Sequence, residues 1–430
     1  KRQSVDNNPY GHNSYVIGKN LYPKDHPYNW QVIGSLDDLQ AATLGDVKEF
    51  FRRWYVPNNT TLVIAGDFNL AQAKEWVHKY FDEIPRGEEI DDLPKRPALV
   101  NQTKKLYHED NFARLPQLTM VWPTVEQYHP DAYALDVLSQ YLSRGKNAPF
   151  YKVIVEDEQL AANVSMFNST SELAGEYRLT VRAFADKNLD DVASAINKAF
   201  LKFEAEGIPQ KDLDRIKAGQ ETAFYNGLSS VLGKGFQLAQ YNIFAKDPGF
   251  VTQDVQNILK VTTEDVLRVY NQYIKDKNYI ATSFVPKGRL SQVLTGSVKA
   301  EVVEEKIVQG AEESFDASIQ ASYEKTPSSF DRSVEPPYGE APEVAIPEVW
   351  TAQTENGMAI YGIENDEVPL VQFNLVIKGG LLLDDPEKVG VANLMAVMMT
   401  QGTKSKTPAQ LEEAIQQLGA NISVSAGREA

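Results

Sequence analysis

Apolar residues recur at helical spacing in several stretches of the chain, and shorter stretches between them alternate apolar with polar residues. Val192, Ile196 and Phe203, for example, lie on one face of a predicted helix. Since helices and strands are mixed without strict alternation, the pattern indicates an α+β protein rather than a doubly wound sheet. Helices are predicted over 130–142, 191–205, 391–400 (largely buried) and 408–418, with another beginning at Pro209, and strands over 118–122, 177–184, 371–377 and 422–425.

One pattern occurs twice, 219 positions apart. Thr43 stands three residues before Asp46, and Thr262 stands three residues before Asp265. This spacing predicts a helix N-cap with an acidic residue in the first turn, where it opposes the positive end of the helix dipole. Each copy continues with an apolar helical face, an Asn turn and an apolar strand, over 61–66 in the first copy and over 279–285 in the second. The shared order indicates duplication of an α+β unit.

A segment of different composition interrupts the chain after this repeat. Between Glu301 and Glu348 there are 12 acidic and three basic residues, together with five prolines, and little apolar periodicity. Such a stretch is typical of a solvated linker between folded bodies. An acidic tail that recruits a basic partner is the alternative. The predicted domains are 1–97 (end of a first domain), 98–300 (a second, related domain), 301–347 (the linker) and 348–430 (the start of a third domain).

Charge and composition exclude several classes of protein. The formal net charge of −16 repels phosphate backbones, so we expect no nucleic-acid partner. The absence of cysteine excludes disulfides and every Cys-based metal site, and it fits either the cytoplasm or a bacterial periplasm. The longest nearly apolar stretch, 389–399, is too short to span a bilayer. The polar start, without Met or a signal peptide, predicts that the chain begins inside a longer protein.

Local motifs for catalysis are missing from the sequence. The five histidines are at least 14 residues apart, whereas a helical zinc site places two imidazoles four residues apart. His26 and His129 each precede a proline and are interpreted as turn residues. The stretch 227–235 approaches a phosphate-binding loop, but the spacing is one residue too long and Gly235 replaces the Ser or Thr.

A series of short motifs nevertheless resembles one family, the inverted-motif zinc metallopeptidases that include pitrilysin, insulin-degrading enzyme and mitochondrial processing peptidase. The resemblance implies duplicated α/β sandwich domains, with helices packed on mainly antiparallel sheets. The residues that carry it are Arg2-Gln3, Asn8-Pro9-Tyr10-Gly11, Leu21-Tyr22-Pro23, His26-Pro27-Tyr28, 56–67 and Gly207-Ile208-Pro209.

The same resemblance supplies a frame for residues 390–403. Members of the family carry His-x-x-Glu-His on a helix, with the Glu as general base and a further Glu as third zinc ligand. In the matching frame here, Asn393 and Val397 occupy the ligand positions and Ala396 occupies the base position. Valine and alanine have no donor and an amide oxygen is a poor zinc ligand, so the resemblance implies a degenerate motif with no metal ligand and no catalytic residue. It places the working motif upstream of Lys1.

The resemblance therefore implies a segment of a bacterial zinc metallopeptidase that degrades peptides in a chamber between two halves. The parent enzyme would use zinc, whereas this segment alone would bind none and would be inactive. Its expected partners are a peptide substrate and the missing N-terminal and C-terminal portions of the same protein, and a homo-oligomer is compatible with the family. Family analogy suggests the periplasm or cell envelope. The alternative is a non-catalytic structural or substrate-recognition subunit of the same family.

Overall fold

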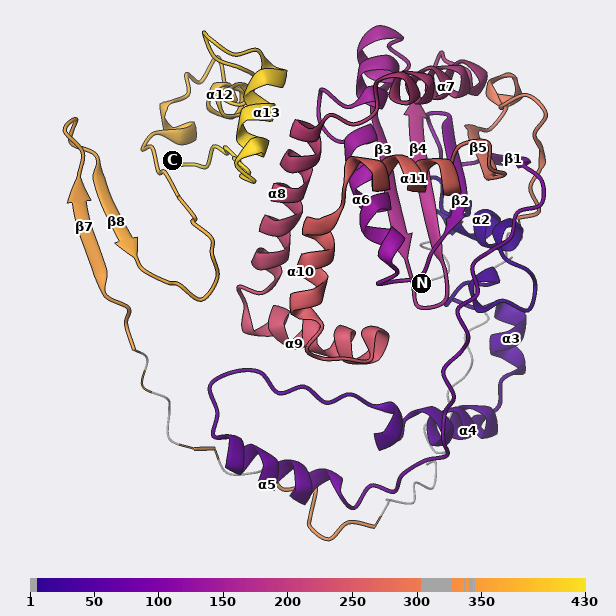
Figure 1. The fold of residues 1–430 in the computed structure, drawn as a ribbon, viewed down its shortest axis with the longest axis vertical. Helices are drawn as coiled ribbons and strands as arrows, with labels where there is room; N and C mark the ends of the chain where they lie inside the picture. The colour runs from indigo at the N-terminus through magenta and orange to yellow at the C-terminus, as the bar shows by residue number, and fades with distance from the viewer. Residues whose placement is uncertain (1–5, 303–326, 336–337, 340–342, 344) are drawn as a thin grey trace.

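The computed structural model describes residues 6–302, 327–335, 338–339, 343 and 345–430. Its centre is a six-stranded sheet with the order β3-β4-β2-β5-β1-β6 (Figure 1). Neighbouring strands from β3 to β5 are antiparallel, whereas β1 pairs in parallel with β5 and with β6. The fold is α+β, as predicted. The strands are β1 (Lys104–Asp110), β2 (Gln117–Thr124), β3 (Ala161–Thr170), β4 (Gly175–Ala183), β5 (Ile280–Pro286) and β6 (Val298–Lys299).

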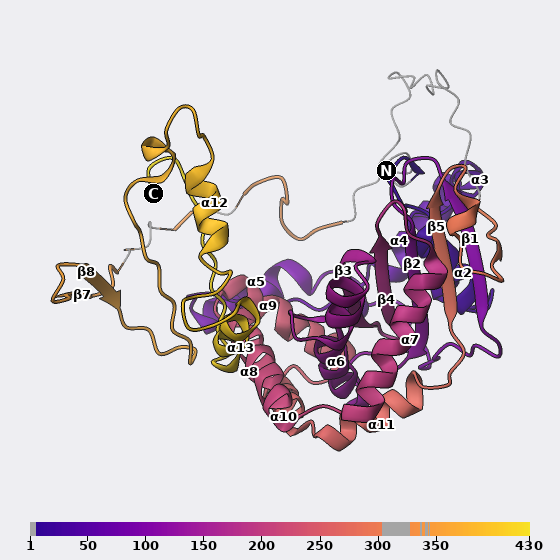
Figure 2. The same ribbon diagram turned by 90° about the horizontal axis from the view of Figure 1, so that it is seen from above.

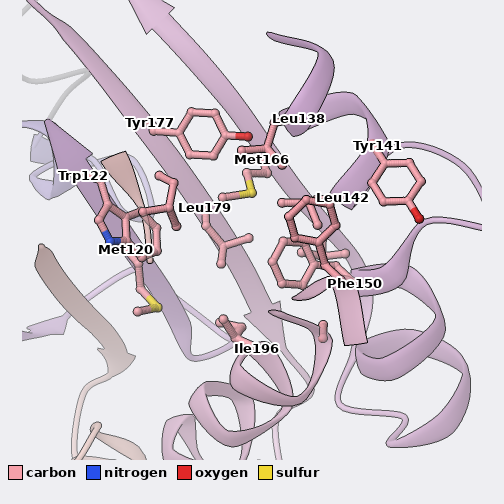
Figure 3. Close-up of a cluster of buried hydrophobic side chains, with 14 of the residues drawn as sticks. Met120, Trp122, Leu138, Tyr141, Leu142, Phe150, Met166, Tyr177, Leu179 and Ile196 are labelled. Atoms are coloured by element: carbon pink, nitrogen blue, oxygen red, sulfur yellow. The ribbon is translucent and has the colours of Figure 1, made fainter. Parts of the chain in front are cut away.

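One face of this sheet is covered by helices that come from the same part of the chain. Their apolar faces meet Met120, Trp122, Leu179 and Val181 of the sheet in a continuous buried core (Figure 3). The predicted helices and strands between residues 118 and 206 are confirmed to within a few residues. The covering helices are α6 (Pro130–Ser143), α7 (Leu189–Glu206) and α11 (Thr263–Tyr273), and the short η3 (Tyr151–Asp157) and η5 (Leu290–Gln292) complete this side.

The opposite face is covered by α2 (Asn13–Leu21) and the turn η1 (Pro27–Asn29). Val16, Ile17 and Leu21 are buried against the sheet. Asn13 is buried as well, and its side chain donates to Thr119 Oγ1 at 3.1 Å and accepts from Thr282 Oγ1 at 2.7 Å. Because buried polar groups need partners, these two bonds fix α2 across β2 and β5. Residues 13–29, assigned to the first domain in the sequence, thus lie on the sheet of the second.

A second group of helices stands beside α6, away from the sheet (Figure 1). The end of α8 nearest the core contributes Leu213 and Ile216 to the buried cluster. Its start just after Pro209 confirms the predicted helix. The group consists of α8 (Gln210–Gly227), α9 (Val231–Gln240), η4 (Tyr241–Ala245) and α10 (Val251–Lys260).

The segment between residues 36 and 81 folds into helices without a sheet. Its helices are α3 (Leu36–Ala41), α4 (Leu44–Trp54), η2 (Pro57–Asn59) and α5 (Leu70–Phe81), and their apolar side chains are largely exposed. The predicted strand over 61–66 is wrong, since these residues form no ladder. A strand requires a hydrogen-bonded neighbour, and no described strand lies beside this stretch.

Residues 345–430 form a small body joined to the rest by the linker, most of which lies outside the described residues. It contains β7 (Val349–Gln353), β8 (Ala359–Ile363), η6 (Gly380–Leu383), α12 (Val391–Met398) and α13 (Pro408–Gln417). Both C-terminal helices were predicted, but α12 is mostly exposed rather than buried, with only Ala396 buried. The predicted strands over 371–377 and 422–425 are wrong for the same reason as 61–66. Among the described residues, no helix has both the length and the apolar character needed to cross a bilayer.

Candidate functional site

The helix α12, which carries Asn393, Ala396 and Val397, begins at an N-terminus that is held by a carboxylate. Gly390 has a φ of 104°, a value that favours glycine, and its N–H donates to Asp384 Oδ2 at 2.8 Å. The N–H of Ala392 donates to the other carboxylate oxygen at 2.9 Å. A carboxylate at this end of a helix satisfies free amides and opposes the helix dipole. The carboxylate of Asp384 therefore fixes the start of α12 at Gly390.

The three motif positions lie on this helix as their spacing requires. Asn393 and Val397 are one turn apart and both are exposed, whereas Ala396 is only 2% exposed and points to the interior of the small body. Methyl groups donate no electron pair to a metal, so Ala396 and Val397 fit neither a base nor a ligand. Zinc therefore does not fit the residues present on α12. Within the described part of the chain, no three His, Cys, Asp or Glu side chains gather in a metal-binding cluster.

Two of the histidines meet in space although they are distant in sequence. The rings of His12 and His108 are 5.7 Å apart between centroids, edge to face, and His12 Nε2 lies 3.8 Å from Asp6 Oδ1. Sequence spacing gave no sign of this pair.

His26 and His129 confirm their interpretation as turn residues. Each is the N-cap of an element that starts with proline, and its Nδ1 accepts a backbone N–H two residues later, at 3.0 Å in both cases. The Nε2 of His26 also lies 3.0 Å from the carbonyl oxygen of Arg96, so this ring is fully engaged in structure.

A cleft of about 740 Å³ with polar side chains lies beside the edge strand β3. Its walls are β3, α6, α8 and α10. On α6 the side chains of Asp136, Ser139 and Ser143 follow one another at helical spacing along the wall. Asp254 of α10 faces them from the other side.

Hydrogen bonds hold the two carboxylates of this cleft in place. Asn168 Nδ2 donates to Asp136 Oδ1 at 3.2 Å, and Tyr133 and Tyr241 each donate a hydroxyl to Asp254 at 2.6 Å. Burial raises the pKa of Asp136 to about 7, and the bond from Asn168 opposes this shift. Asp136 therefore changes its charge near neutral pH, and the cleft offers one or two negative charges to a ligand.

The open edge of β3 is covered at its middle by a side chain. Ser143 Oγ accepts the N–H of Met166 at 3.1 Å and lies 3.3 Å from the Met166 carbonyl oxygen. A serine hydroxyl thus takes the place of a neighbouring strand at this residue. An incoming extended peptide would have to displace this hydroxyl in order to pair along the whole edge.

Sequence reasoning missed this cleft. Asp136 and Asp254 belong to two helices, and nothing in the sequence brings those helices together. A signal was present nonetheless, because Asp136, Ser139 and Ser143 form a polar row on α6 next to the apolar row of Leu135, Leu138 and Leu142. A second polar row on a helix that is otherwise buried indicates a cavity or a polar contact.

A second cleft, of about 650 Å³, lies between the second domain and the C-terminal body. Figure 2 shows α13 against α8 at this place. Acidic side chains of α13 are bound there: the backbone N–H of Lys146 donates to Glu412 Oε2 at 3.1 Å, and Lys211 Nζ lies 3.1 Å from Glu413 Oε1. Arg215 also donates to Gln416. The two parts of the chain thus contact each other through charged and polar side chains.

Two family profiles match the chain. One, described as the peptidase M16 inactive domain, matches residues 41–220, and the other, described as insulinase (peptidase family M16), matches residues 362–430. The second match contains α12.

Relatives of known sequence agree with these profiles. The chain is 28% identical over 283 residues to the zinc protease PqqE of Helicobacter pylori, covering 64% of this chain and 62% of that protein. It is 21% identical over 200 residues to the probable zinc protease PqqL of Escherichia coli, covering 46% of this chain and 21% of that protein. The chain thus spans less than two thirds of the length of these curated relatives.

Solved structures show the same fold. A protease from Helicobacter pylori superposes with a TM-score of 0.59 at 25% identity, over 66% of this chain and 70% of that chain. A peptidase M16 inactive domain from Pseudomonas fluorescens superposes with a TM-score of 0.58 at 18% identity, over 70% and 69%. The profiles, the relatives and the shared fold agree on one assignment: this chain belongs to the M16 family of pitrilysin-like peptidases.

Proposed function

We propose that this chain is the non-catalytic middle of a zinc-dependent metalloendopeptidase whose two halves enclose a peptide. The observation that carries the proposal is that Asn393, Ala396 and Val397 lie together on α12, because the family resemblance assigns these positions to the zinc ligands and the base. The match to an inactive domain over 41–220 supports the same conclusion for the other half of the chain. Hydrolysis is assigned to residues outside this chain.

The contribution of this chain would be to hold the substrate. An edge strand can add an extended peptide through main-chain hydrogen bonds, and β3 is the edge of the sheet that borders the polar cleft. Asp136 and Asp254 give that cleft a negative character that suits a basic side chain or a terminal ammonium group. The contact between α8 and α13 supports a closed arrangement of the two halves around the substrate.

The relatives support a proposal for the compartment and partners of the parent protein. One solved relative is a periplasmic protease from Escherichia coli, and on that likeness we place the parent protein in a bacterial periplasm or cell envelope. Its partners would be the peptide substrate and the remaining portions of the same protein.

The competing function is a non-catalytic subunit of the same family. A relative in Saccharomyces cerevisiae, 20% identical over 309 residues, is the beta subunit of the mitochondrial processing peptidase, so chains of this kind also occur as subunits. The discriminating feature is the coding sequence upstream of Lys1. An intact His-x-x-Glu-His followed by a Glu supports the enzyme, and a degenerate motif supports the subunit.

The decisive experiment compares the chain with the product of its complete reading frame. We expect the complete protein to cleave a fluorogenic peptide and to lose that activity with a zinc chelator, whereas the 430-residue chain cleaves nothing. A complete protein that carries no zinc and cleaves no peptide in a broad library would favour the recognition subunit. Cleavage by the isolated chain would contradict the proposal.

A further inference from the structure

Residues 328–333 of the linker contact the end of α5, and no motif in the sequence predicted this contact. We propose that residues 328–333, called here the anchor segment, fasten the linker to the end of α5 through Glu83, so that the C-terminal body is held on a short tether. This inference concerns the linkage between the halves and is independent of the assignment of catalysis.

A single carboxylate receives three different groups of the anchor segment. Ser328 Oγ lies 2.5 Å from Glu83 Oε1, the Ser329 N–H donates to Oε2 at 2.7 Å, and Arg332 Nη2 donates to Oε1 at 2.6 Å. Isolated surface ion pairs contribute little to stability. Here a backbone amide, a hydroxyl and a guanidinium meet at one acceptor, and such a network with charge-assisted bonds is the more stable arrangement.

The end of α5 provides further contacts for the same segment. Arg332 Nη2 also donates to the carbonyl oxygen of Tyr80 at 2.9 Å, at the negative end of the helix dipole, where a cation is favoured. The ring of Phe330 packs edge to face on the ring of Tyr80, with centroids 5.0 Å apart, and the Arg332 guanidinium lies 4.5 Å from the Phe330 centroid. Apolar and polar contacts therefore act at one place.

The anchor segment also has a defined turn of its own. Asp331 accepts the N–H of Ser333 at 2.9 Å and its hydroxyl at 2.7 Å, and Arg332 Nε donates to Ser328 Oγ at 3.2 Å. These local bonds present Ser328 and Arg332 on the same side, toward Glu83. The hydroxyl of Ser328 and the amide of Ser329 hold the pKa of Glu83 at about 2, so this acceptor is ionised throughout the physiological range.

The consequence is a change in the reach of the C-terminal body. From Val302, a linker residue just after the second domain, to Val349 at the start of β7 there are 47 residues, which can span at most about 165 Å when fully extended. From Ser333 to Val349 there are 16 residues, which can span at most about 56 Å. A shorter tether raises the effective concentration of one half near the other.

The test uses the full chain and two matched substitutions. Glu83→Gln removes the charge that holds the anchor segment. Glu89→Gln is the control, because Glu89 is an exposed carboxylate in the same loop, paired with Arg86 at 2.7 Å and without contact to the anchor segment. Hydrogen exchange is followed at the Ser329 amide, and limited trypsin digestion is followed at the bond after Arg332.

The proposal predicts a protected Ser329 amide in the unmodified chain and in Glu89→Gln. In Glu83→Gln we expect exchange at least tenfold faster and a comparable acceleration of cleavage after Arg332. Equal exchange in all three proteins, or exchange at the unprotected rate in the unmodified chain, would overturn it.

A distance measurement separates a local contact from a tether. Since the chain has no cysteine, spin labels can be attached at Lys74→Cys on α5 and Glu355→Cys in the hairpin β7–β8 without background labelling. We expect Glu83→Gln to broaden the distance distribution toward longer values and Glu89→Gln to leave it unchanged. An unchanged distribution in Glu83→Gln would show that the contact does not limit the reach of the C-terminal body.

Discussion

The two copies of the internal repeat, α4 and α11, have the same local structure in opposite surroundings. Both begin with a capping box, in which Thr43 or Thr262 accepts the N–H of Asp46 or Asp265 and the aspartate accepts the threonine N–H in return. Beyond the cap they differ. Val266, Val269 and Tyr270 are at most 2% exposed, whereas their counterparts Val47, Phe50 and Phe51 are 59–60% exposed.

This difference separates what a local sequence specifies from what a neighbour supplies. All the groups of a capping box lie within four consecutive residues, so the box forms in both copies. Burial of the apolar face depends on a sheet, and among the described residues only α11 has one beneath it. The strand that follows shows the same contrast, because β5 lies in the middle of the sheet while 61–66 has no ladder.

The largest expected difference between the two copies comes from truncating the aromatic residues at equivalent positions. Tyr270→Ala removes a buried ring and the donor to Glu204 Oε1 at 2.7 Å, and we expect a loss of about 3–5 kcal/mol in the free energy of unfolding. Phe51→Ala, at the equivalent exposed position, should change that free energy by less than about 0.5 kcal/mol. Urea denaturation followed by circular dichroism measures both. Equal losses would mean that α4 is covered in solution.

The free energy of unfolding should depend on pH in opposite directions in the buried second domain and in the exposed helix α4. The pKa of Asp136 is raised to about 7 by burial, so the folded second domain favours the protonated acid. The stabilisation that the protonated Asp136 gives the folded state is present in full below the ordinary pKa of aspartate. It is lost as pH rises from about 4 to about 7, and the free energy of unfolding falls by as much as about 4 kcal/mol. In α4 the hydrogen bond from Thr43 lowers the pKa of Asp46, so its contribution is lost as pH falls.

The measurement is the free energy of unfolding between pH 4 and 8, with two variants. Asp136→Asn should abolish the decline between pH 4 and 7. Asn168→Ala removes the bond that lowers the pKa and should move the decline to higher pH. A decline that persists unchanged in Asp136→Asn would show that another group causes it.

Removing the caps gives the smallest effect, and it should be the same in both copies. Thr43→Ala and Thr262→Ala each delete the side-chain acceptor of a capping box, and we expect each to cost about 1 kcal/mol in local opening of the helix. Hydrogen exchange of the first-turn amides of α4 and α11 measures this cost. Thr43→Ser and Thr262→Ser retain the hydroxyl and serve as controls. A cost confined to α11 would contradict an independent role for the cap.

The same reasoning explains which parts of the fold could be predicted from the sequence. Helices α6 and α7 and strands β2 and β4 follow from local periodicity, and so do the N-caps at Thr43 and Thr262. The strands predicted over 61–66 and 371–377 do not form, because a strand exists only with a hydrogen-bonded partner, which local periodicity does not reveal. The burial expected for α12 was wrong for a related reason, since no described sheet packs on it.

Some features of the candidate site could likewise be predicted from the sequence, and others could not. The places of Asn393, Ala396 and Val397 on one helix could be predicted from their spacing, and their reading as a degenerate motif rested on family resemblance. The cleft between Asp136 and Asp254 could not be predicted, because it depends on how α10 packs beside α6. The contact between Glu83 and Arg332 depends on a chain path across 249 positions, which no local pattern encodes.

Zinc content tests the central claim most directly, that this chain holds no metal site of its own. The chain would be equilibrated with excess zinc, freed of loosely bound ions by dialysis, and analysed by inductively coupled plasma mass spectrometry, together with His12→Ala and His108→Ala. We expect far less than one zinc per chain in all three proteins. One tightly held zinc per chain, lost in either histidine variant, would contradict the account.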